Sequence, residues 1–318
     1  MFGYEHPDNR VFAFLKYIPA ELKGAFNVNF LERKWKYGEV KLFRAEQLYT
    51  ASNYQAFLST FRTGFPQYVF LDPLRGKEVI SVPKEYVREI YVPKECLFSL
   101  ISLGKKDSLQ KTTLDFVNLL SAESGVPLAD FGVHGSVALN MHSPMSDIDI
   151  VAYGSSNFRA VEEAVDRLVD ARKLSYQFNN RLDKARRFKG KYRDKIFMYN
   201  AIRKFEEINT EYGMFRYSPI ASVRFTCTVN EDSEAMFRPA IYRIKNYEPT
   251  NSPSDVPENE IPEVVVSMIG CYRNVARKGE GMRVSGMLEL VENLKTAKIF
   301  HQVVVGTGLN EDECICPV

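Results

Sequence analysis

The chain has 318 residues, of which 45% are hydrophobic and 26% are charged. This composition is typical of a folded protein and excludes wholesale disorder, and the length is enough for two or three domains. The formal net charge of +2 points to no partner by itself. No apolar run reaches the ~18 residues that span a membrane, so we expect no membrane partner.

The N-terminus and the cysteines predict a cytoplasmic protein. The first residues, MFGYEHPDNR, include acids and lack the basic and apolar regions of an export signal. The five cysteines are odd in number, and only Cys314 and Cys316 lie close together in the sequence. These two thiols do not complete a metal site, and a disulfide framework is not indicated. A reducing cytoplasm is the expected location.

The N-terminal region reads as β-rich. Residues 11–92 contain short aromatic and β-branched runs that are separated by Gly, Pro and Asn, which predicts strands. Residues 52–64 have helical spacing and end at Gly64. We predict a β-rich N-terminal domain over residues 1–95.

The middle of the chain, residues 96–247, predicts a mixed α/β domain. Apolar spacing predicts helices over 111–125, 157–173 and 196–208, a brief helix over 136–142, and strands over 129–135, 147–154, 218–229 and 234–247. This order of helices and strands, ending in an antiparallel pair, implies a mixed sheet with helices packed on it.

The C-terminal region begins after a break in composition. Residues 248–263 hold four prolines and a surplus of acids, which predicts a linker or a long loop. Strand-like runs follow, so we predict a small β module over residues 264–318. The predicted fold class is α/β (α+β), with a central mixed-sheet domain and flanking helices between two β-rich regions.

Two aspartates interrupt the apolar strand predicted over 147–154. Asp147 and Asp149 are two residues apart, so their side chains lie on the same face of a strand, about 7 Å apart. Carboxylates in an apolar strand are costly unless a partner compensates them. Mg²⁺ prefers oxygen ligands and is often held by one or two carboxylates together with substrate phosphates. The pair therefore predicts a divalent metal site.

A Gly-Ser pair precedes these aspartates at a predicted strand-to-helix turn. Free backbone N–H groups at such a turn favour a phosphate. Gly135 allows a close backbone approach, and the Ser136 hydroxyl is a donor. A phosphate-binding turn beside a metal-binding strand is the combination that enzymes of phosphoryl or nucleotidyl transfer use.

The pattern of an apolar residue, Gly135-Ser136, about ten residues, and Asp147-x-Asp149 in an apolar strand resembles the DNA polymerase β-like nucleotidyltransferase superfamily. The resemblance covers about residues 111–245, and the layout is similar to stand-alone prokaryotic, often archaeal, members. It implies that Gly135 and Ser136 hold a nucleoside triphosphate such as ATP. It also implies that Asp147 and Asp149 are catalytic and bind two Mg²⁺ ions, with Mn²⁺ as an alternative.

The resemblance has one gap. The family usually has a third carboxylate on a later strand, which helps to activate the attacking hydroxyl. The strand predicted in that place, residues 222–229, has Arg224 or Thr226 at the expected position and contains no acid. A nearby acid of residues 231–234 could replace it, or the third group could be absent.

A basic stretch over residues 181–195 contains only two acids, Asp183 and Asp194. It predicts either a phosphate-binding surface or an ordinary solvated helix face. On the first reading, Arg186, Arg187 and Lys191 bind the nucleotide. His134 and His142 flank the Gly-Ser turn, and a role in substrate binding and a purely structural role both stay open.

The sequence thus predicts a Mg²⁺-dependent enzyme that transfers a nucleoside monophosphate to a hydroxyl and releases pyrophosphate. An RNA 3′ end is the favoured acceptor, and a protein or small molecule is also possible. One alternative is a noncatalytic nucleotide- or RNA-binding protein of the same fold that lacks the third carboxylate. A sugar-nucleotide glycosyltransferase would also use an Asp-x-Asp pair, but it leaves the Gly-Ser turn unexplained.

Overall fold

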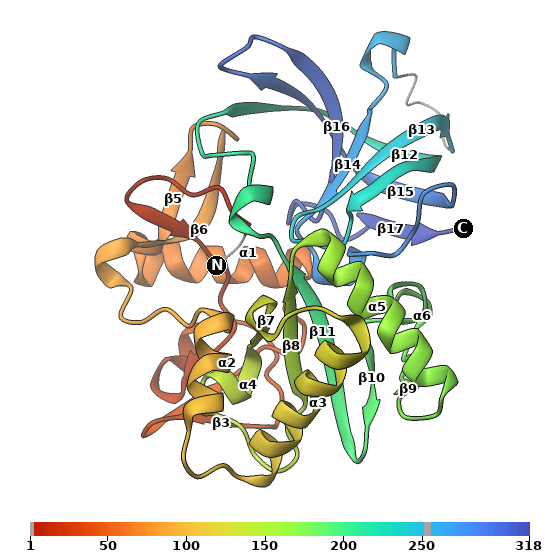
Figure 1. The fold of residues 1–318 in the computed structure, drawn as a ribbon. Coiled ribbons are helices and arrows are strands. Elements are labelled where there is room, and N and C mark those ends of the chain that lie inside the picture. The colour runs from red at the N-terminus through yellow and green to blue at the C-terminus, as the bar shows by residue number, and fades with distance from the viewer. Residues whose placement is uncertain (1–2, 251–255) are drawn as a thin grey trace. The chain divides into compact units, whose positions relative to one another are not determined.

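The computed structural model describes residues 3–250 and 256–318. They divide into two compact units, one of residues 89–208 and one that joins the residues up to Arg88 to Asn209–Val318 (Figure 1). Residues 251–255 of the predicted linker lie outside the described part of the chain. None of the helices in the described residues has the length and apolar character needed to cross a bilayer.

The unit of residues 89–208 is built on a five-stranded sheet with the order β7-β8-β11-β10-β9. In this sheet β8 is antiparallel to β7 and parallel to β11. The elements of this unit are α2 (Pro93–Ser102), α3 (Ser108–Ser124), β7 (Phe131–Val133), α4 (Gly135–Ala138), β8 (Ile148–Tyr153), α5 (Ser155–Asp170), β9 (Ser175–Tyr176), α6 (Arg181–Arg186), β10 (Lys189–Tyr192) and β11 (Lys195–Ile202).

The helices α3 and α5 pack against one face of this sheet (Figure 1). Ile148 and Ile150 of β8 are fully buried, and they share one face of the sheet because they are two residues apart. On the neighbouring strand, the Phe197 ring lies 4.6 Å from the ring of Phe116 on α3. The side chain of Asp149, which lies between Ile148 and Ile150, therefore points to the opposite face of the sheet.

The helix predicted over residues 196–208 is wrong, because Lys195–Ile202 forms β11. Phe197, Tyr199 and Ala201 alternate along this strand and are all buried, which is a two-residue period. Aromatic residues favour strands when their side chains pack on a covered face. The helical signal came from the charged end of the segment, which forms a short 3-10 helix over Phe205–Glu207.

The described residues of the other unit form three sheets, with the orders β1-β6-β5, β2-β4-β3 and β12-β13-β14-β16-β15-β17. Because β12 also pairs with β15, five strands of the largest sheet close into a ring of pairings, as in a small barrel. β12 runs through residues 230–233, which separate the two strands predicted over 218–229 and 234–247. The elements are β1 (Arg10–Phe12), β2 (Ile18–Pro19), β3 (Trp35–Tyr37), β4 (Val40–Phe43), α1 (Ala51–Gly64), β5 (Val69–Asp72), β6 (Lys77–Pro83), β12 (Phe215–Glu234), β13 (Ala240–Pro249), β14 (Val264–Ser267), β15 (Gly281–Asn293), β16 (Ile299–Val305) and β17 (Cys314–Pro317).

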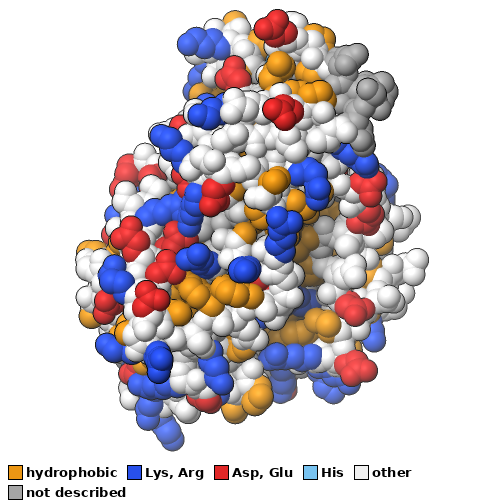
Figure 2. Space-filling view, turned by 90° about the vertical axis from the view of Figure 1, so that its right-hand side faces the viewer, with side chains coloured by type: hydrophobic (Ala, Val, Ile, Leu, Met, Phe, Trp, Pro, Cys, Tyr) orange, Lys and Arg blue, Asp and Glu red, His pale blue; other side chains and the backbone are white. Residues whose placement is uncertain are grey.

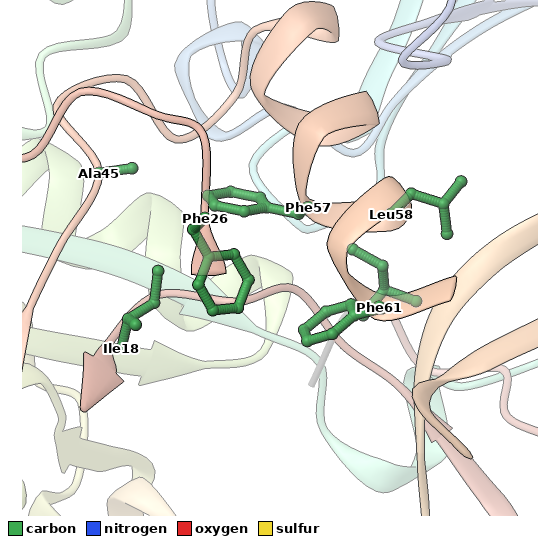
Figure 3. Packing of buried hydrophobic residues seen from close by; sticks show 7 residues of the cluster. Ile18, Phe26, Ala45, Phe57, Leu58 and Phe61 are labelled. Carbon is green, nitrogen blue, oxygen red and sulfur yellow. The ribbon is translucent and has the colours of Figure 1, made fainter. Parts of the chain in front are cut away.

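A cluster of buried side chains anchors α1 in this unit (Figure 3). Phe57 and Phe61 lie one helical turn apart, and both rings meet the ring of Phe26 at 5.9 Å in an edge-to-face arrangement. Such pairs add to the free energy gained by burying the rings. The mixed α/β architecture with β-rich regions on both sides confirms the predicted fold class.

Candidate functional site

The Gly-Ser turn and the aspartate pair lie against each other at one edge of the five-stranded sheet. The end of β7 lies beside the start of β8 in the sheet. There the backbone N–H of His134 donates to the carbonyl of Asp149 at 3.0 Å. Gly135 has a φ of +66°, and a Cβ at this position would overlap Oδ2 of Asp149 and lie 2.9 Å from its Cγ. Only glycine combines this backbone conformation with so close an approach. Two motifs that lie apart in the sequence therefore form one site.

The two aspartates are on the face of the sheet opposite α3 and α5. Asp147 is exposed and directly precedes β8, whereas Asp149 lies within the strand and is partly exposed. Their side chains alternate with the buried Ile148 and Ile150, so both point away from α3 and α5. Carboxylate oxygens in this arrangement suit a hard divalent cation that also binds substrate phosphates.

The strand predicted to lie at the position of the third carboxylate is not part of the five-stranded sheet. Residues 222–229 belong to β12, which pairs with β13 and β15 in the other unit, so this placement of Arg224 and Thr226 is wrong. The strand beside β8 is β11, with Met198 opposite Asp149. The site face of β11 carries Met198 and Asn200 and no acid. Within the described residues, no group of three or more His, Cys, Asp or Glu side chains is placed to hold a metal ion.

Asn200 is a further residue of the candidate site, which the sequence pattern does not predict. It is only 5% exposed, and its Nδ2 lies 3.3 Å from Nε2 of His134. β8 lies between β7 and β11 in the sheet. The hydrogen bond therefore joins His134, at the end of β7, to Asn200 of β11 across the strand that carries Asp149. Asn200 was overlooked because its segment was predicted to be a helix, which hides its pairing with β8.

Two lysines of the basic stretch share the face of the aspartates. β10 is antiparallel to β11, with Lys189 opposite Met198 and Lys191 opposite Ile196. Asp149, Met198 and Lys189 therefore form a row across three strands, which puts Lys189 about 10 Å from Asp149. Lys191 is exposed and Lys189 is partly buried. Both are suitably positioned to meet the phosphates of a substrate at the aspartates.

The two predicted arginines are engaged elsewhere. Arg186 forms an ion pair with the buried Asp183 at 2.6 Å, and Arg187 pairs with Asp166 of α5 at 3.3 Å. Asp166 belongs to the helix that covers the opposite face of the sheet. The role of these arginines in nucleotide binding stays a prediction, and the geometry favours Lys189 and Lys191.

We expect Lys189→Gln and Lys191→Gln each to raise the KM for the nucleoside triphosphate about tenfold, because each removes one charge-assisted contact to a phosphate. Steady-state kinetics at several triphosphate concentrations measures this effect. Lys184→Gln is the matched control, because Lys184 is an exposed lysine on α6. Equal KM values in all three variants would contradict the assignment.

The loop between the two motifs is tied at several points. The backbone N–H of Met141 donates to the carbonyl of Ser136 at 2.8 Å. Nε2 of His142 lies 2.7 Å from Oδ2 of Asp107. Asp107 caps α3, where its side chain accepts from the backbone N–H of Gln110. The loop that separates Gly135 from Asp147 is thus fastened to the start of a helix that packs on the sheet.

The pKa of Asp107 is lowered, as expected for a carboxylate that caps a helix. Burial acts to raise its pKa, but hydrogen bonds from Gln110 and His142 outweigh that effect, and the pKa is lowered. A lowered pKa means that the carboxylate stabilises the fold above the pKa of the unfolded chain, and that this stability is lost as the pH falls through the folded pKa.

Asp107→Ala should lower the free energy of unfolding by about 1 kcal/mol through loss of the helix cap. Asp107→Asn keeps a capping side chain, so it should cost less. Urea unfolding at pH 7 and at a pH well below 3.8, the ordinary pKa of an aspartate, measures both effects, and we expect the gap in unfolding free energy between wild type and Asp107→Ala to narrow at the lower pH. A gap that is unchanged at low pH would show that the ionised form is not what stabilises the cap.

A comparison with protein families finds a match that covers the residues of the candidate site. Residues 116–211 match the family model of the nucleotidyltransferase domain. The chain is 26% identical over 325 residues to Uncharacterized protein MJ1086 of Methanocaldococcus jannaschii, an alignment that covers 96% of this chain and 90% of the relative. No solved structure matches the chain. The matched residues include both aspartates and the Gly-Ser turn, and residues 116–211 therefore form a nucleotidyltransferase domain.

Proposed function

We propose that this protein transfers a nucleoside monophosphate from a nucleoside triphosphate to a hydroxyl group, in a Mg²⁺-dependent reaction. The observation that carries the proposal is the contact of Gly135 with Asp149, which leaves no room for any side chain between them. A phosphate at the Gly135-Ser136 turn would lie directly beside the carboxylates. This adjacency is what a bound metal–triphosphate complex requires.

The side chains at the site have distinct roles in this proposal. The backbone at Gly135 and the hydroxyl of Ser136 bind the triphosphate, and Lys189 and Lys191 bind its outer phosphates. Asp147 and Asp149 hold Mg²⁺, for which Mn²⁺ can substitute. The bound ion supplies charge neutralisation at the phosphoryl oxygens and a lower pKa for the attacking hydroxyl.

The proposed reaction needs no reactant other than the triphosphate and the acceptor. The acceptor hydroxyl oxygen forms a bond to the α-phosphorus, and the bond from that phosphorus to the oxygen that bridges to the β-phosphate breaks. Pyrophosphate leaves, and the hydroxyl proton passes to water. The residues of the site contribute by positioning and by electrostatic stabilisation, which dominate phosphoryl transfer.

A noncatalytic nucleotide- or RNA-binding protein is the second candidate. The specific observation that favours it is Asn200, an uncharged side chain on the strand beside β8, where the described residues offer no third acid. On this alternative the site binds the triphosphate without turnover.

Incubation with triphosphates labelled at the α-phosphate, Mg²⁺ and total RNA separates the two candidates. Transfer of label to RNA, together with pyrophosphate release, supports the enzyme, and the Asp147→Asn, Asp149→Asn double variant should lose both signals. Tight nucleotide binding without release, with RNA, protein and small-molecule acceptors alike, would contradict the enzyme and support the binding protein.

A further inference from the structure

A second basic surface lies in the unit that does not contain the nucleotidyltransferase domain. Residues 16–44 hold seven Lys or Arg residues and three Glu residues, a net charge of +4. The whole chain has a net charge of only +2, so the remaining residues together carry −2. These residues include the sheet β2-β4-β3, and we call the segment 16–44 the basic sheet.

Aromatic rings hold several cations of the basic sheet in place. Nζ of Lys23 lies 4.5 Å from the centroid of the Phe43 ring and 5.2 Å from that of Phe30. Nζ of Lys34 lies 6.0 Å from the Phe43 centroid. A cation–π contact orients an ammonium group but leaves its net charge in place. The charges are therefore positioned and still available to an anion.

Carboxylates do not compensate these lysines. Within the described residues, no Asp or Glu lies within ion-pair distance of Lys23, Lys34 or Lys41, and Lys36 pairs with the exposed Glu39. Lys36 lies directly opposite Lys41 in the pairing of β3 with β4, where side chains are about 5 Å apart. Like charges in this position destabilise a sheet, and an anionic partner would remove that cost.

Other parts of the protein surface carry both signs of charge. On the face drawn in Figure 2, Lys and Arg side chains are interspersed with Asp and Glu, as expected for a surface whose charges compensate one another. The basic sheet instead concentrates one sign of charge, which is the electrostatic pattern of a nucleic-acid contact.

We propose that the basic sheet binds the phosphate backbone of single-stranded RNA. Its apolar side chains do not suit a membrane, because a membrane-binding surface presents a row of large apolar groups. Among the large hydrophobic residues of this segment only Val40 is strongly exposed, at 42%, whereas Trp35 is 9% exposed. That the bound RNA is the acceptor rests on the proposed transferase function. That the basic sheet binds RNA does not depend on this function.

Fluorescence anisotropy with a labelled single-stranded RNA of 20 nucleotides tests the proposal over a range of salt concentrations. The test variant is Lys23→Gln, Lys34→Gln, Lys41→Gln. The control is Lys245→Gln, Lys278→Gln, Lys298→Gln, which removes three exposed lysines from the same unit. We expect the test variant to lose about 10- to 100-fold in affinity and its slope of log affinity against log salt to fall by about 2.

Equal RNA affinity in the two triple variants would overturn the proposal. So would binding to vesicles that contain phosphatidylserine but not to RNA. Thermal unfolding of both variants checks that the fold is retained. Pyrophosphate release with a dinucleotide acceptor separates this inference from the proposed function. If the test variant loses RNA affinity but the wild type releases no pyrophosphate, the basic sheet remains an RNA contact and only the transferase function is refuted.

Discussion

Asp149→Asn should lower the rate of nucleotidyl transfer about 10³-fold. Asp149 is the carboxylate that lies against Gly135, and it lies within β8, whereas Asp147 directly precedes this strand. Asparagine has nearly the same shape but no charge, so it weakens the metal site without creating a cavity. The loss of several kcal/mol of charge stabilisation in the transition state corresponds to this factor.

Pyrophosphate release at saturating triphosphate and Mg²⁺ measures this effect. Asp170→Asn is the control, since Asp170 is an exposed aspartate at the end of α5 and should retain full activity. The melting temperature of Asp149→Asn should stay close to that of the wild type, because the side chain is partly exposed. A variant that keeps more than a tenth of the wild-type rate would show that Asp149 does not hold the catalytic charge.

The second large effect is expected for Gly135→Ala, which should lower the rate about 100-fold. The added Cβ would collide with the Asp149 carboxylate, and a displacement of about 1 Å in a catalytic group costs about this factor. The variant also forces alanine into the left-handed region, because φ is +66°, which costs about 1–2 kcal/mol of stability.

Gly125→Ala separates the two consequences. Gly125 ends α3 with a φ of +72°, and a Cβ at this position would meet no atom within 4 Å. Both variants should therefore lose the free energy of unfolding that a left-handed alanine costs, and Gly135→Ala should lose more because of the collision with Asp149. Only Gly135→Ala should lose activity. If both retained the wild-type rate, the close contact of Gly135 with Asp149 would have no catalytic role.

The local parts of the site were predictable from the sequence. Asp147 and Asp149 alternate with the buried Ile148 and Ile150, and the glycine before Ser136 stands where a strand turns into a helix. Both signals depend on residues close together in the chain, so periodicity and turn chemistry are enough to detect them.

The parts that depend on pairing between distant segments were not predictable in this way. The sequence pattern predicts a helix where β11 lies, and it gives no sign of Asn200, whose contact with His134 spans 66 residues. The strand expected to carry the third acid belongs to another sheet, since β12 pairs with β15 and β13. The same holds for Arg187, whose partner Asp166 lies on a preceding helix. Sheet order and non-local ion pairs arise from tertiary packing, which overrides local propensity.

The central claim is that the Gly135 turn and Asp149 form a single site for a metal–triphosphate complex. Calorimetric titration of an α,β-methylene ATP analogue, with and without Mg²⁺, tests it most directly because it does not depend on turnover. In the wild type we expect Mg²⁺ to raise the affinity for the analogue about 5- to 150-fold, the usual range of coupling between two sites. In Asp149→Asn this factor should fall to about 1. The same Mg²⁺ dependence in both proteins would contradict the claim.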